Sequence, residues 1–260
     1  MTFDSREYNP VIADISMEAL LKNFYPTYSG GLGGLKGDDF RAYADLGISA
    51  AGVILAYTNG YFRQVVDKKS GWQYEESTYW DPDSTLGRIK EETVIKNKGH
   101  DLHLGAHSFI QKGETGYSIP VLLITTNLVE NKDSWDRGIT GTLYDSSDEY
   151  KISQRNVLGQ GSIKLLDTLW KNIRVYALNE GHAAFASLLK DNCAFTNHTP
   201  VDAGFDKFNY GLANWILGDL LPKNIRDLAG YDTLNMNKLA ANKCRLIDGV
   251  SRRHAEVCRQ

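Results

Sequence analysis

The strongest indication of the fold class comes from residues 11–57, VIADISMEALLKNFYPTYSGGLGGLKGDDFRAYADLGISAAGVILAY. Residues 11–16 are short and β-branched, which is typical of a strand. Residues 38–46 lie between glycines, and their apolar side chains have the spacing of a helix with one buried face. Residues 48–57 are rich in Ile, Val, Leu and Ala with little alternation, as a buried parallel strand requires. The predicted order is strand, glycine-rich loop, helix, strand.

The same alternation returns later in the chain and predicts an α/β layer structure. Further strands are expected at 119–124, 174–178 and 194–196, and further helices at 150–170 and 183–190. Residues 72–119 are poor in helix signals and rich in Thr, Val and Gly, so a meandering β insertion is expected there. We therefore expect residues 1–260 to form one domain, a Rossmann-like parallel sheet with helices on both faces and a β-rich insertion.

Composition argues against several classes of partner. The chain has 29 Lys+Arg against 32 Asp+Glu, a formal charge of −3, so no positive surplus is present to hold nucleic acid or an anionic membrane. No apolar run approaches the roughly 18 residues that span a bilayer. The first ten residues carry acids and lack the apolar region of a secretory signal, which predicts a cytoplasmic location. The three cysteines are widely separated, so we expect reduced thiols and no structural zinc site.

The glycine run Ser29–Gly34 is the sharpest local signal. Consecutive glycines let backbone amides approach a ligand closely, and the start of a helix favours negative charge. The run does not match a P-loop or a dinucleotide-binding loop, because neither the Gly-Lys-Ser/Thr register nor Gly-x-Gly-x-x-Gly is present. The alternative interpretation is a flexible turn between strand and helix.

Polar clusters follow two of the predicted strands, at Asn179–His182 and at Asn197–Thr199. Ligands of open α/β sheets bind beyond the carboxyl ends of strands, so we expect these clusters and the glycine run to meet in one crevice. Glu180, His182 and His198 can bind sugar hydroxyls or transfer protons. The alternative is that the histidines are structural residues with all their hydrogen bonds made inside the protein.

A third group of histidines has the spacing H-x2-H-x3-H. His100, His103 and His107, with Asp101 nearby, are a workable set of metal ligands. The segment is predicted to be strand or loop, and no helical period would present the three rings on one face. We therefore expect no metal site there.

Several motifs occur in an order that resembles the α-glucan phosphorylases, the family of glycogen and maltodextrin phosphorylases, and above all its shorter members. The resemblance begins with Ile-Ala-Asp-Ile-Ser-Met-Glu at 12–18. It continues in the family's order through segments 28–33, 61–64, 71–73, 150–159, 178–185, 196–201 and 249–252. Each motif alone is weak, and their collinearity makes the match specific.

The resemblance implies the N-terminal, acceptor-side half of a two-domain glycosyltransferase of the GT-B architecture. It implies that the amides of Gly30, Gly31 and Leu32 meet phosphate and the glucosyl unit, and that His198 lies at the sugar subsite. The residues that the family would place along the glucan path are Glu180, His182 and Asn197.

The reaction implied is phosphorolysis, in which orthophosphate cleaves a terminal α-1,4 bond and leaves glucose 1-phosphate. The family uses pyridoxal phosphate, whose lysine belongs to the C-terminal half, and no segment of this chain resembles that lysine's motif. The partners implied are an α-1,4-glucan or maltooligosaccharide and orthophosphate. A separate chain with the C-terminal half, or a homo-oligomer, would complete the site.

The chain departs from the family pattern at three places. Gly141-Thr142 replaces Asp-Arg, Asp145–Asp148 replaces Gly-Gly-Asp, and Arg155 replaces a glutamate, which implies a reversed charge beside the cleft. Two alternatives therefore stay open. One is a glucan-binding module without turnover, and the other is a glucan synthase that uses a nucleotide sugar.

Overall fold

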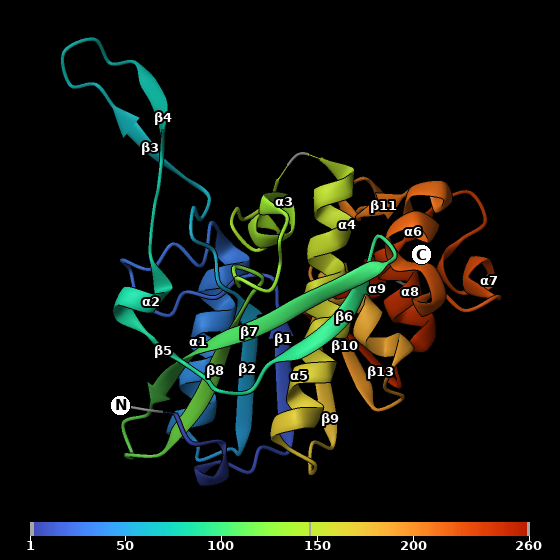
Figure 1. Cartoon of the computed structure of the whole chain (residues 1–260), viewed down its shortest axis with the longest axis horizontal. Coiled ribbons are helices and arrows are strands. Elements are labelled where there is room, and N and C mark those ends of the chain that lie inside the picture. The colour runs from blue at the N-terminus through green and yellow to red at the C-terminus, as the bar shows by residue number, and fades with distance from the viewer. Residues whose placement is uncertain (1–2, 146, 259–260) are drawn as a thin grey trace.

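The computed structural model describes residues 3–145 and 147–258 and shows a mixed α/β fold around a twisted central sheet (Figure 1). The sheet strands in the described residues are β1 (Ile12–Ser16), β2 (Ala50–Leu55), β5 (Gly87–Arg88), β6 (Thr93–Asn97), β7 (His100–Lys112), β8 (Ser118–Thr125), β9 (Val175–Asn179), β10 (Cys193–Asn197) and β13 (Leu246–Gly249). Strands β13, β10, β9, β1, β2 and β8 lie side by side in that order and run parallel. The predicted α/β class is confirmed.

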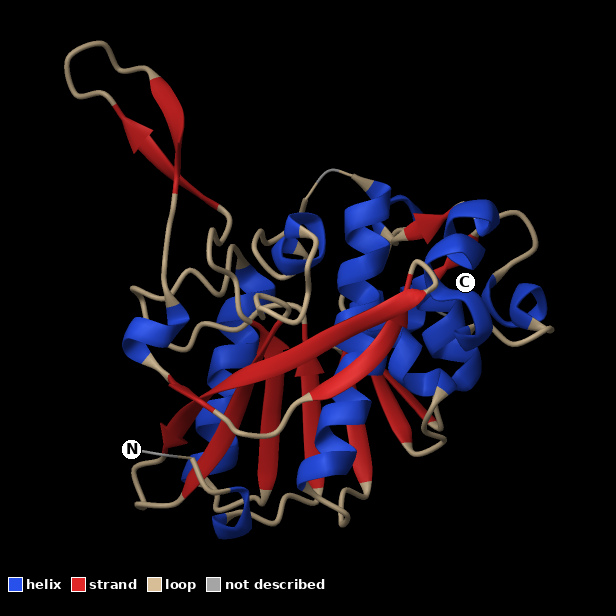
Figure 2. Ribbon diagram, in the orientation of Figure 1, coloured by secondary structure: helices blue, strands red, loops and turns tan. Residues whose placement is uncertain are grey.

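Helices cover both faces of the sheet, as predicted (Figure 2). On one face, α1 (Gly31–Asp45) buries Phe40 in a cluster with Ile54 of β2. On the other, α5 (Ser162–Leu169) buries Leu166 in the largest apolar cluster. Strand side chains alternate between the two clusters, because successive residues of a strand point to opposite faces.

The helix expected at 150–170 is present as one continuous rod made of α4 (Asp148–Asn156), a π-helical turn η2 (Val157–Gly161) and α5. A Cβ on Gly159 would lie 2.7 Å from Cβ of Phe185, and one on Gly161 would lie 2.6 Å from Cδ1 of Leu104. The two glycines therefore let this rod pack tightly on the sheet and on the helix that follows β9.

The start of α1 corrects the sequence prediction. The glycine run was expected to be a loop with the helix at 38–46, but the helix begins at Gly31. A Cβ on Gly33 would lie 2.5 Å from Cβ of Tyr28, and one on Gly37 would lie 2.3 Å from the carbonyl oxygen of Leu20. These glycines serve the close approach of the helix to the segment before it. Local propensity alone gives no sign of that contact.

Residues 183–190 were expected to be a helix, and the structure has the tighter 3₁₀ helix η3 (Gly181–Leu188), which begins two residues earlier. Beyond β10, three helices and a two-stranded ribbon surround a second apolar cluster that includes Phe195 of β10. Sequence patterns had given no element there. These elements are β11 (Lys207–Phe208), α6 (Tyr210–Leu217), α7 (Ile225–Ala229), β12 (Leu234–Asn235) and α8 (Met236–Lys243).

The expected β region 72–119 contains strands that extend the central sheet. Strand β7 pairs antiparallel with β8, and β5 and β6 pair with β7. At the start of this region, β4 (Gln73–Ser77) pairs with β3 (Phe62–Val66), and the two strands form a hairpin that projects from the body of the molecule (Figure 1).

The remaining helices in the described residues are short, and they lie mostly in the connections between the larger elements. None of the helices that the structure describes combines the length and apolarity needed to cross a bilayer. They are η1 (Ser5–Glu7), α2 (Pro82–Thr85), α3 (Ser134–Gly138), η4 (Asp202–Gly204), η5 (Gly218–Leu220) and α9 (Arg252–Cys258).

Candidate functional site

The carboxyl ends of β1, β9 and β10 bring the predicted polar clusters together. Asn179 at the end of β9 donates from Nδ2 to Oγ of Ser16 on β1, at 2.8 Å. The side-chain oxygen of Asn179 is 2.5 Å from Nε2 of His198, which follows β10. The convergence of the clusters after β9 and β10 is therefore confirmed.

The N-terminus of α1 joins this arrangement through Glu18. The Oε2 atom of Glu18 accepts hydrogen bonds from the amides of Ser29, at 2.6 Å, and Gly30, at 3.3 Å. Its Oε1 atom accepts from the Tyr144 hydroxyl at 2.8 Å, and the Tyr144 ring lies 5.8 Å from the His182 ring. Neither Glu18 nor Tyr144 was singled out as a site residue from the sequence.

Part of the α1 N-terminus stays open to a ligand. Gly30 is the N-cap and Gly31 the first helical residue, and a Cβ on either would meet no atom within 4 Å. Within the described residues, the amides of Gly31 and Leu32 have no hydrogen-bond partner. Free amides at a helix N-terminus suit an anion, although the Glu18 carboxylate already supplies one negative charge nearby.

Glu180 is buried, and its carboxylate accepts hydrogen bonds from other groups of the protein. Oε2 accepts from the amide of His198 at 3.0 Å and from Oγ1 of Thr199 at 3.1 Å. Oε1 accepts from the Gly181 amide at 3.1 Å and from Nδ2 of Asn237. The backbone of Glu180 has φ of +65°, a strained conformation for a residue with a side chain. Glu180 therefore orders the loops after β9 and β10.

Asn197 has a similar internal role. Its side-chain oxygen accepts from the Thr199 amide and from Nδ2 of Asn237, both at 3.2 Å. Direct contact of Glu180 or Asn197 with glucan stays a prediction, and in this structure both side chains hold the loop that carries His198.

His198 is a half-buried, neutral hydrogen-bonding group. Burial lowers its pKa, and the Glu180 carboxylate opposes this only in part. Because Nε2 donates to the side-chain oxygen of Asn179, Nδ1 carries the lone pair and can accept from a ligand hydroxyl. The carbonyl oxygen of His198 also accepts from Nε2 of His254, at 3.0 Å, which fixes the loop further.

His182 is also neutral. Burial lowers its pKa to about 4, and the positive charge of Arg155 acts in the same direction. Its Nδ1 atom is buried and has no hydrogen-bond partner among the described residues. A buried nitrogen without a partner indicates a group that binds a water or a ligand.

The resemblance implied a reversed charge beside the cleft, but the charge of Arg155 is not exposed there. Its side chain is buried, and Nε lies 2.8 Å from Oδ2 of Asp206, which compensates the charge. Burial acts to raise the pKa of Asp206, but the Arg155 charge and hydrogen bond, together with the nearby His182 and Lys151, outweigh burial and the pKa is lowered. Of the other departures, Ser146 lies outside the described residues, and Thr142 donates its amide to the Tyr150 hydroxyl at 3.1 Å.

The three spaced histidines do not meet. Nε2 of His100 lies 2.8 Å from Oδ2 of Asp136, whereas Nε2 of His107 lies 2.9 Å from Oδ1 of Asp83. Within residues 3–145 and 147–258, no three metal-ligating side chains group together.

With this geometry in place, comparison with known proteins gives a consistent result. No protein-family model matches the chain. The chain is 32% identical over 96% of its length to the maltodextrin phosphorylase of Thermococcus litoralis. It is 28% identical over 95% of its length to the glycogen phosphorylase of Mycobacterium tuberculosis, and 24% identical over 96% to that of Aquifex aeolicus.

The chain is a relative of the α-glucan phosphorylases. The matched region lies in the N-terminal part of these proteins. The chain spans about a third of the length of the Thermococcus and Mycobacterium phosphorylases, 33% and 34%. A protein of Methanocaldococcus jannaschii described only as uncharacterized, MJ1631, is 28% identical over 93% of this chain, which covers 48% of that protein.

Proposed function

We propose that this chain forms the glucan- and phosphate-binding wall of an α-glucan phosphorylase of the GT-B architecture. The observation that carries the proposal is a chain of contacts at the carboxyl edge of the sheet. His198 contacts Asn179 at the end of β9. Tyr144, whose ring lies 5.8 Å from the His182 ring, donates its hydroxyl to Glu18, the carboxylate that holds the Ser29 and Gly30 amides. Neutral imidazoles and free amides at the same edge of the sheet suit a substrate pair made of a polyol and an anion. The names of the relatives, maltodextrin and glycogen phosphorylase, indicate that the polyol is an α-glucan and the anion is orthophosphate.

In this proposal each group has a defined task. The Nδ1 lone pair of His198 accepts from a sugar hydroxyl, and the His182 imidazole, whose Nδ1 atom is buried, lines the glucan path. The amides of Gly31 and Leu32 bind orthophosphate oxygens, on which negative charge accumulates during phosphorolysis. Fixed dipoles directed at developing charge need no reorganisation, so they stabilise the transition state.

Pyridoxal phosphate, the cofactor implied by the resemblance, fits this chain only in part. Its phosphate would act as an acid–base group toward the orthophosphate that the open amides at the α1 N-terminus would hold. The nearby amine is Nζ of Lys36, which lies 2.9 Å from Asp14 and 2.9 Å from Asp39 and is therefore held as a paired ammonium. We assign no cofactor lysine in this chain. We propose that a second domain or chain, which is not part of these residues, binds the pyridoxal ring.

The sugar-binding half of the proposal is tested by titrating maltoheptaose into the chain and measuring heat. His198→Ala removes one hydrogen bond to the sugar, which is worth about 1 kcal/mol, so the affinity should fall roughly fivefold. His103→Ala, on β7 and outside the site, is the matched control and should bind like the wild type. Unchanged affinity in His198→Ala, with the fold intact by circular dichroism, would remove His198 from the site.

The phosphate half is tested with Gly31→Val. A side chain at Gly31 projects into open space, so the fold should persist while the branched group blocks the amides. We expect weaker binding of orthophosphate and an unchanged affinity for maltoheptaose. Full phosphate binding by a folded Gly31→Val variant would show that the glycine run is only a structural helix start.

Turnover distinguishes a phosphorylase from a binding module. The chain is mixed with maltoheptaose, orthophosphate, pyridoxal phosphate and the C-terminal part of a related phosphorylase, and glucose 1-phosphate is measured. Product that depends on His198 supports the proposal. Glucan binding without any product in this mixture favours a glucan-binding module instead.

A further inference from the structure

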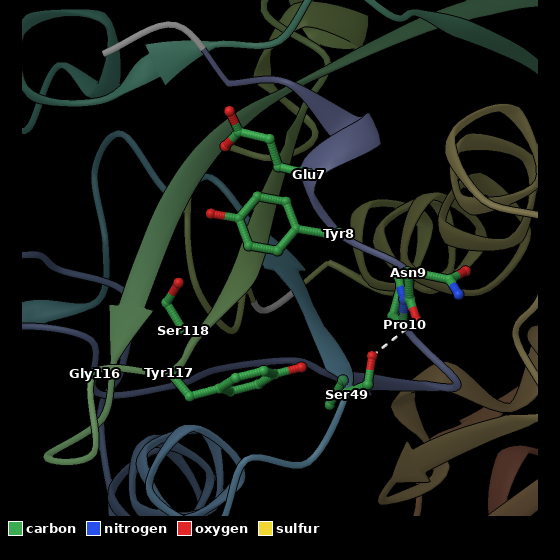
Figure 3. Close-up of a pocket in the computed structure, with 9 residues that line it drawn as sticks. Glu7, Tyr8, Asn9, Pro10, Ser49, Gly116, Tyr117 and Ser118 are labelled. Carbon is green, nitrogen blue, oxygen red and sulfur yellow. Dashed lines mark hydrogen bonds between the residues drawn. The ribbon is translucent and has the colours of Figure 1, made fainter.

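A cavity lies at the opposite end of the sheet from the candidate site. It sits at the amino ends of β1 and β2 and beside the β7–β8 turn, and its volume is about 290 Å³ (Figure 3). Three separate segments of the chain form its wall. The lining residues are Glu7, Tyr8, Asn9, Pro10, Ser49, Ala50, Gly116, Tyr117 and Ser118.

Two tyrosine rings border this cavity, one on either side of it in the close-up (Figure 3). The Tyr8 ring stacks on Phe3, with ring centroids 5.9 Å apart and planes at 11°. Tyr117 follows Gly116, whose φ of +84° makes the tight turn, and the carbonyl oxygen of Tyr117 accepts from the Gly113 amide at 2.8 Å. Stacking on Phe3 therefore holds the Tyr8 ring, and the turn holds the backbone that carries Tyr117.

The polar groups of the cavity divide into two sets. Ser49 donates from Oγ to the carbonyl oxygen of Asn9, at 2.8 Å, and so braces the wall. Within the described residues, the hydroxyls of Tyr8, Tyr117 and Ser118 and the carboxylate of Glu7 make no hydrogen bond inside the protein. They offer both donors and acceptors to a ligand.

The charge of the lining narrows the class of ligand. No lysine or arginine is among the lining residues, and Glu7 contributes a negative charge, so a phosphate or carboxylate ligand is disfavoured. Hydroxyls next to flat apolar rings suit a neutral polyol that has both polar edges and an apolar face.

We infer that this cavity binds one glucose unit of an α-glucan, as a second sugar site remote from the first. The identity of the sugar rests on the proposed function, whereas the polyol class rests on the cavity alone. Two sites on one molecule raise the effective concentration of a long glucan at each of them, without new contacts at the first site.

The inference is tested by recording amide ¹H–¹⁵N spectra of the full chain during titration with maltose. We expect two independent sets of shifts, one at 116–118 and one around His198. Tyr117→Ala should reduce the affinity of the first set roughly tenfold and leave the second unchanged, because it removes one aromatic wall. Tyr231→Ala, an exposed tyrosine that does not line the cavity, is the matched control.

The two sites can fail separately. Shifts around His198 alone would overturn the second site and leave the proposed function standing. Shifts at 116–118 alone, lost in Tyr117→Ala, would support a polyol site while the proposed function fails. If maltose moves neither set, both are overturned.

Discussion

At the scale of single residues, burial decides what the two site histidines can do. The pKa of His182 is lowered to about 4 by burial and by the Arg155 charge, and the pKa of His198 is lowered by burial. An unfolded histidine titrates near pH 6.5. Between pH 6.5 and 4 the unfolded chain therefore binds protons that the folded chain does not, and stability is lost as the pH falls through this window.

This pH dependence gives a test of the His182 environment. Exchange of His182 for glutamine removes the imidazole, so the loss of unfolding free energy between pH 7 and pH 4 should shrink, by up to about 3 kcal/mol. Urea unfolding at both pH values measures it. His103→Gln, away from the site, serves as control, and an equal slope in wild type and His182→Gln would mean that His182 is not buried in the folded chain.

Some site residues were not predicted from the sequence, namely Tyr144, Glu18 and Asp206. Tyr144 and Glu18 are joined by a hydrogen bond across more than a hundred residues, and Arg155 meets Asp206 across fifty. The spacing of neighbouring residues in the sequence does not predict contacts between side chains so far apart along the chain. The Ser-Met-Glu motif at 16–18, which begins at the last residue of β1, was the signal that pointed toward Glu18.

At the scale of elements, the glycines of α1 have different tasks. Gly34 has nothing within 4 Å of a Cβ, so Gly34→Ala should stabilise the chain by about 0.5–1 kcal/mol through higher helix propensity. In Gly37→Ala the new Cβ would lie 2.3 Å from a backbone carbonyl oxygen, and a shift of the helix should cost about 1–3 kcal/mol.

Thermal or urea denaturation of the two alanine variants measures the difference, and each is the control for the other. Equal effects at Gly34 and Gly37 would contradict the packing contact between α1 and Leu20.

The strands were easier to predict than the helix boundaries. Strands β2 and β8 are continuous apolar runs, and a run of that kind indicates a buried parallel strand wherever it occurs. The beginning of α1 was missed because glycine has a low helix propensity. Packing against Tyr28 and Leu20 outweighs that propensity only in the folded chain.

At the scale of the whole molecule, the β3–β4 hairpin makes few packing and strand-pairing contacts with the body of the molecule. Its two strands pair only with each other, and Val66 and Tyr74 remain 52% and 48% exposed. A two-stranded hairpin is marginal in water without further packing. The body of the molecule, by contrast, has apolar clusters on both faces of the sheet.

Limited proteolysis should show this difference. Lys68 and Lys69 lie exposed in the hairpin turn, so trypsin should cut there early while Lys164 in α5 stays protected. Mass spectrometry of the first fragments identifies the cuts, and a Lys68→Gln, Lys69→Gln variant should lose them. Cleavage at Lys164 as fast as at the hairpin would show that the body is no more stable than the projection.

The sequence by itself determined the strand–helix alternation, the parallel sheet and the polar residues at the ends of β9 and β10. These follow from periodicity and residue type, which act over a few neighbouring residues. Only the tertiary structure decided that α1 begins inside the glycine run. It also decided that the Glu180 carboxylate bonds Asn237 and the His198 loop, and that Asp206 compensates the charge of Arg155. Those outcomes depend on which distant side chains the packed sheet brings within hydrogen-bond distance, and a linear pattern does not encode that distance.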